Sequence, residues 1–86
     1  MKVRIPTPLR SYTNNESVVD ANGSTVSELL DDLDGRYPGI RFRVVDEQGR
    51  LRKHMKVFVG KDATRDLATS VDRAPEVVIM QALSGG

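Results

Sequence analysis

The residues best suited to chemistry in this sequence are the last two, Gly85 and Gly86. They follow an apolar run at positions 76 to 83 that has the composition of a strand. We expect such an end to hold the α-carboxylate on a thin tether without side chains, which can enter the active site of another protein. Chain ends are often frayed, however, and two glycines at one fixed position occur by chance in about 0.5% of chains. The pair is a candidate that the rest of the sequence must support.

Composition removes most other kinds of reactive site. The sequence contains no cysteine, which excludes disulfides, thiolate metal sites and a thiol nucleophile. His54 is the only histidine, so one copy of the chain cannot assemble a multi-histidine metal site or a Ser-His-Asp triad. The acidic residues Asp31, Asp32 and Asp34 lack the recognisable loop of a calcium site. We therefore expect no catalytic residue of the chain's own, no metal site and no permanently bound cofactor.

Length and net charge also restrict the function. A chain of 86 residues forms one domain, which is too small for a substrate-enclosing cleft between domains. A formal net charge of +1 gives no overall attraction to nucleic acid or to an anionic membrane. No segment approaches the roughly 18 apolar residues of a membrane span, and nothing resembles a signal peptide. We expect a cytoplasmic protein that binds neither nucleic acid nor membrane.

Positive charge is nevertheless concentrated in the middle of the chain. The residues concerned are Arg41, Arg43, Arg50, Arg52, Lys53 and His54. Only Phe42 and Phe58 could act as stacking platforms here, which argues against a single-strand nucleic-acid site. Such a run most often forms a solvated face or a rim that steers an acidic partner.

The strongest local signal is a helix start at Thr25-Val26-Ser27-Glu28, which has the form of a capping box. Apolar residues at 26, 29, 30, 33 and 37 fall on one helical face, and Pro38-Gly39 ends the pattern. The sequence predicts one amphipathic helix of about three turns that covers one face of a sheet.

Strand-like segments surround this helix. Residues 1–6 and 17–19 predict a β-hairpin with a loose loop, while 55–59 and 77–83 predict two later strands. Residues 40–45 alternate like a strand but are short enough for an irregular turn, so both alternatives stay open.

The order strand, strand, helix, strand, weak segment, strand predicts an α+β fold of the β-grasp (ubiquitin-like) type, a mixed sheet with one main covering helix. We expect the domain to span 1–83 and residues 84–86 to form a flexible Gly-Gly tail.

Segments along almost the whole chain resemble the ubiquitin-like sulfur carriers of the ThiS and MoaD type, and most nearly the CysO-like carriers. They are Val-Arg-Ile-Pro-Thr-Pro-Leu-Arg at 3–10, the helix start at Thr25, Tyr37-Pro38-Gly39-Ile40, Val57-Phe58-Val59-Gly60 and Leu83-Ser84-Gly85-Gly86. Only the terminal glycine pair is chemically specific. The turn Asp72-Arg73-Ala74-Pro75-Glu76 departs from the family, which commonly shows Asp-Gly-Asp there.

The resemblance implies that a ubiquitin-activating-type adenylyltransferase (ThiF/MoeB-like) uses ATP to adenylate Gly86. Sulfur then replaces AMP to give a thiocarboxylate, which a sulfur-accepting synthase consumes in the biosynthesis of cysteine, another amino acid, a cofactor or a secondary metabolite. Gly85, Ser84 and Leu83 would position the tail, and a metalloprotease would expose it if the encoded chain is longer. The alternatives are a protein modifier joined through Gly86 to lysine, and a non-covalent β-grasp interaction module.

Similarity to ubiquitin implies a partner-binding face made of Val57, Phe58, Val78 and Met80. Strand alternation leaves a second interpretation open for Val57, because Met55, Val57 and Val59 share one face of their strand and could all be core.

Overall fold

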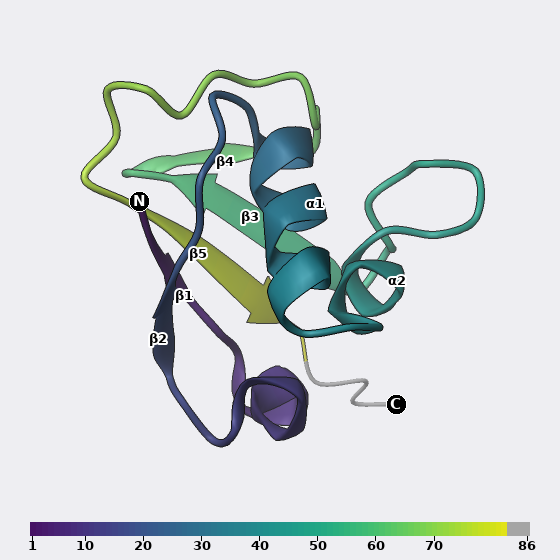
Figure 1. Ribbon diagram of the computed structural model, residues 1–86. Helices are drawn as coiled ribbons and strands as arrows, with labels where there is room; N and C mark the ends of the chain where they lie inside the picture. Colours follow the sequence, from purple (N-terminus) through teal and green to yellow (C-terminus); the bar gives the residue numbers. More distant parts are fainter. Residues whose placement is uncertain (83–86) are drawn as a thin grey trace.

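The computed structural model describes residues 1–82, and its centre is one five-stranded mixed sheet in the order β2-β1-β5-β3-β4 (Figure 1). The strands are β1 (Lys2–Arg4), β2 (Val18–Asp20), β3 (Met55–Val59), β4 (Asp62–Thr64) and β5 (Glu76–Gln81). Strand β5 runs parallel to β1 and antiparallel to β3, so the last strand lies in the middle of the sheet. This arrangement confirms the predicted α+β, β-grasp class.

Helix α1 (Val26–Arg36) crosses one face of the sheet (Figure 1). The capping box is confirmed, because the Thr25 hydroxyl accepts a hydrogen bond from the Glu28 N–H at 3.2 Å. The Glu28 carboxylate accepts from the Ser24 N–H at 2.8 Å, one residue before the cap itself. The first bond satisfies an N–H group that the start of the helix leaves without an intrahelical partner, and the second ties Glu28 to the residue before the cap.

One hydrophobic core fills the space between this helix and the sheet. The helix contributes its apolar face, Val26, Leu29, Leu30 and Leu33, as the periodicity predicts. The sheet contributes alternate residues of its strands: Val3, Val19, Met55, Val57, Val77 and Ile79. The opposite face of each of these strands is therefore available to solvent or to a partner.

Two connections differ from the prediction. The loop of the β1–β2 hairpin is ordered by a 3-10 helix, η1 (Thr7–Thr13), whose residues Leu9 and Thr13 are buried. Residues 40–45 form neither a strand nor an irregular turn, because α2 (Ile40–Val44) is a short helix.

A local reversal before α2 explains this difference. Gly39 has φ +98°, a left-handed conformation that favours glycine, and it turns the chain after α1. The Asp34 carboxylate then accepts hydrogen bonds from the N–H groups of Gly39 and Arg41, both at 3.1 Å. Ile40 and Val44 are both buried, whereas Phe42 between them is 59% exposed. An alternating strand would place all three side chains on one face, but a helical turn places Ile40 and Val44 in the core and Phe42 on the opposite side.

Candidate functional site

The site is the place where the chain leaves the sheet at the carboxyl end of β5. Gln81 is still paired with Met55, and the Ala82 N–H donates to the His54 carbonyl at 2.7 Å. The ladder to β3 therefore continues to Ala82. The predicted tail residues Leu83, Ser84, Gly85 and Gly86, with Gly86 as the covalent site, lie outside the described residues.

An apolar face borders this exit on the side of the sheet that α1 does not cover. Phe58 is paired with Val78, and Lys56 with Met80, so these four side chains share one face. Met80 is 48% exposed, while Phe58 and Val78 are half-buried. We call Phe58, Val78 and Met80 the outer sheet face. A hollow of about 260 Å³ lies beside it, lined in part by Lys56, Phe58 and Ala63.

Val57 does not belong to this face, and its assignment as a partner-binding residue is wrong. Its side chain is only 1% exposed and packs in the core with Met55 and Ile79. The reason is the alternation of β3, which directs residue 57 toward α1 and residues 56 and 58 away from it.

A second surface borders the exit on the side of α2. We call Phe42, Arg43, Arg52 and His54 the tail-root surface; together they line a hollow of about 330 Å³. The Arg52 guanidinium carbon lies 4.7 Å from the centre of the Phe42 ring, and its Nε donates to the Phe42 carbonyl at 2.8 Å. This cation–π contact and hydrogen bond fix the charge beside an aromatic ring that is itself 59% exposed.

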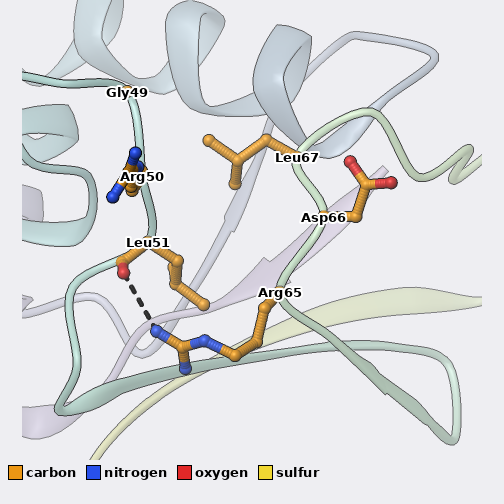
Figure 2. Close-up of a pocket in the computed structure, with 6 residues that line it drawn as sticks. All are labelled: Gly49, Arg50, Leu51, Arg65, Asp66 and Leu67. Carbon is orange, nitrogen blue, oxygen red and sulfur yellow. Dashed lines mark hydrogen bonds between the residues drawn. The ribbon is translucent and has the colours of Figure 1, made fainter.

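Arg65 holds the segment that carries this surface. Its guanidinium donates to the carbonyls of Leu51 at 2.9 Å, Arg52 at 3.1 Å and Met55 at 3.1 Å. Figure 2 shows the Leu51 bond at the edge of a hollow of about 470 Å³ between the 49–51 and 65–67 segments. Three bonds from one planar cation fix the turn that leads into β3. Sequence reasoning missed this residue, since an isolated arginine in a weakly patterned segment carries no local signal.

Asp46 orders the other end of the same segment. Its carboxylate accepts from the N–H groups of Arg50 at 3.0 Å and Gln48 at 2.9 Å. The hydrogen bond from Arg50, together with the one from Gln48 and the charges of Arg52 and Arg50, holds the Asp46 pKa below its ordinary value.

The acidic residues of α1 act structurally. Asp32 accepts from the Asn22 N–H at 2.8 Å and from Arg36 at 3.0 Å, and the Asn22 bond is the main reason that its pKa is lowered. Asp31 forms a 2.7 Å ion pair with Arg41. Within residues 1–82, no three histidine, aspartate or glutamate side chains are grouped closely enough to hold a metal ion. Over the same range, no helix is long and apolar enough to cross a membrane.

A central strand that ends beside an exposed apolar face, in a β-grasp domain, defines a ubiquitin-like protein. The match to the ThiS family model extends over residues 3–86, so this chain belongs to the ThiS family. The sulfur carrier protein CysO of Mycobacterium tuberculosis is 34% identical over 89 residues, which cover 98% of this chain and 96% of that protein. Proteins of this kind are small carriers, and this chain is a carrier of the same type, not an enzyme.

Solved structures of ubiquitin-like proteins share this fold. A chain in the crystal structure of the Amycolatopsis orientalis BexX/CysO complex superposes with a TM-score of 0.90 and 36% identity, covering 99% of this chain and 98% of that one. The SAMP1 protein of Haloferax volcanii superposes with a TM-score of 0.76 and 26% identity, covering 99% of this chain and 97% of that one. In the first structure the similar protein is in a complex with a partner protein.

Proposed function

We propose that this chain is a sulfur carrier that works through a thiocarboxylate on Gly86. The observation that supports this most is that the family match runs to residue 86 and includes both terminal glycines. The near full-length similarity to CysO supports the same conclusion. No catalytic group of the chain is required, because its part is to present a carboxylate and to be recognised.

The chemistry takes two steps on the partner enzyme. A carboxylate is a poor electrophile, so its oxygen first attacks the α-phosphorus of ATP, pyrophosphate leaves, and an acyl-adenylate forms on Gly86. Hydrosulfide then attacks the carbonyl carbon and AMP leaves, which gives the thiocarboxylate. If a protein persulfide attacks instead, a thiol must afterwards cleave the S–S bond to release the same product. ATP is thus a substrate of the activating enzyme and is not a cofactor of this chain.

Three partners follow from this scheme. They are a ThiF/MoeB-like adenylyltransferase, a synthase that accepts the sulfur, and a metalloprotease where the tail needs trimming. The BexX/CysO complex is a precedent for a carrier of this kind bound to a partner protein. The resemblance to CysO favours cysteine, another amino acid or a specialised metabolite as the acceptor pathway.

A second candidate function is that of a protein modifier joined through Gly86 to lysine. The similarity to SAMP1 of Haloferax volcanii, a small archaeal modifier protein, favours this alternative. Carrier and modifier share every step through the acyl-adenylate and differ in whether sulfur or a lysine amine displaces AMP.

The test is reconstitution of adenylation. Purified protein is mixed with an adenylyltransferase of this type from the same host and Mg-ATP, and the products are examined by tandem mass spectrometry with and without sulfide. We expect AMP on Gly86 without sulfide and a thiocarboxylate with it. A chain lacking Gly86 is the control. Failure of the wild-type chain to accept AMP would leave only a non-covalent interaction module.

A further inference from the structure

We propose that the tail-root surface is a second docking surface, and that it binds an acidic protein surface at the entrance of the adenylyltransferase site that receives the tail. This inference rests on the proposed function. It concerns Phe42, Arg43, Arg52 and His54, which lie on the opposite side of the exit from the outer sheet face.

The tail-root surface lies beside the last described residue of the chain. The Ala82 N–H is bonded to the His54 carbonyl, so the last described residue of the chain is attached to this surface. The Arg52 N–H donates to the Val44 carbonyl at 3.0 Å and the Arg52 side chain to the Phe42 carbonyl, which joins α2 to the same strand end. Any enzyme that admits residues 83–86 must approach Ala82 closely. Its rim therefore meets the tail-root surface together with the end of the outer sheet face.

The tail-root surface belongs to a segment with a net positive charge. Residues 41–56 contain six Lys and Arg against two Asp and Glu, which gives them a formal charge of +4 and leaves −3 on the rest of the chain. Arg41 is paired with Asp31, and the Asp46 carboxylate is occupied by backbone N–H groups. Among the described residues, the side chains of Arg43 and Lys53 have no such partner, and both are exposed. A surface of this sign attracts an acidic partner and speeds association.

Two side chains of the tail-root surface, Phe42 and Arg52, are already in contact with each other. An exposed aromatic ring stacked with arginine is the type of pair that anchors protein interfaces. Phe42 and Arg52 are held together before any partner arrives, so less conformational entropy is lost on binding. The activating enzyme is the partner we choose, because both the carrier and the modifier must pass through adenylation.

The experiment measures ATP-dependent adenylation of this chain by that enzyme at several salt concentrations. Arg43→Glu and the pair Arg43→Glu/Arg52→Glu are compared with the matched control Lys61→Glu/Arg73→Glu. The control residues line a hollow beside the start of β5, away from the exit. Arg43→Glu is included because Arg52 has a structural hydrogen bond and Arg43 has none within residues 1–82. Thermal unfolding of each variant verifies the fold.

We expect the double variant to raise the KM for this chain about tenfold, with kcat changed less than about twofold, and the control to stay close to wild type. The wild-type KM should rise with salt, and this dependence should be weaker in the double variant. Phe42→Ala should also raise KM.

Five results would overturn the proposal. One is an equal change of KM in the tail-root variants and in the control variant. Another is a KM raised by Phe42→Ala but unchanged by the charge variants, which would indicate an apolar partner. A third is binding of a labelled single-stranded oligonucleotide that the double variant abolishes. Adenylation of wild type with no effect of any variant would refute the docking surface and leave the proposed function standing, whereas no adenylation of wild type refutes both.

Discussion

The outer sheet face and the tail-root surface border the same strand end but are built by different means. Phe58, Val78 and Met80 come from paired strands, and simple alternation places them together. Phe42 and Arg52 come from α2 and from the segment before β3, and specific hydrogen bonds hold them together. Burial of apolar area responds little to salt, whereas charge pairing is screened by it. From this difference we expect the first surface to contribute mainly affinity for the activating enzyme, and the second mainly orientation and association rate.

A charge introduced on the outer sheet face should have the largest effect on binding to the activating enzyme. Met80→Glu is expected to weaken binding to the activating enzyme about 30-fold, because a carboxylate would replace an apolar side chain in the partner-binding face that similarity to ubiquitin implies. Titration calorimetry at two salt concentrations measures the loss, which should remain at high salt. Ala68→Glu, an exposed position on the 65–70 segment, is the matched control. Equal losses for both variants would remove the outer sheet face from the interface.

One substitution made at two neighbouring positions separates core from surface. Val57→Thr should lower the free energy of unfolding by about 2 kcal/mol, because a hydroxyl enters the dry core. Val78→Thr, on the outer sheet face, should change it by less than about 0.5 kcal/mol but weaken partner binding. Urea denaturation and calorimetry measure the two quantities. The reverse pattern would contradict the burial of Val57.

Arg65→Lys should affect the tail-root surface more than the outer sheet face. Lysine cannot reproduce three bonds from one planar group, so we expect a loss of about 1 kcal/mol in stability. Amide hydrogen exchange should increase in residues 50–54 with little change in the middle of β5. The control is Arg73→Lys, which lies at the other end of β5. An equal increase in amide hydrogen exchange in residues 50–54 and in the middle of β5 would show that Arg65 has no local role.

The smallest expected effect is on acid stability. The Asp46 pKa is lowered in the folded protein, so its contribution is complete above the ordinary value of 3.8 and is lost as pH falls through the lowered value. Asp46→Asn should therefore be less stable than wild type near neutral pH, and the difference should shrink in acid. Urea titrations from pH 7 to about pH 2.5 measure this, with Asp20→Asn on the edge strand as control. A difference that is constant with pH would mean that the charge of Asp46 is not involved.

Sequence alone predicted the strand-built part of the molecule well. The capping box, the apolar face of α1 and the alternation of β3 and β5 are local patterns, and each matches the structure. The alternation of β3 also indicates that Val57 belongs to the core, whereas the similarity to ubiquitin implied a partner-binding position.

The remaining part depends on contacts between distant residues. Helix α2 forms because Gly39 reverses the chain and Asp34 caps it, and the alternating apolar residues there mimic a strand. The basic run at 41–54 was visible, but its position at the exit depends on the His54–Ala82 bond and on Arg65, which the sequence does not reveal.

The most direct test of the account is the intact mass of the protein isolated from its own host. A thiocarboxylate replaces one oxygen of the Gly86 carboxylate by sulfur, so we predict a species heavier by about 16 Da, absent from a chain that lacks Gly86. Localisation of the added mass to Gly86 by tandem mass spectrometry would complete the assignment. Lysine-linked adducts through Gly86 without this species would identify a modifier and contradict the sulfur-carrier account.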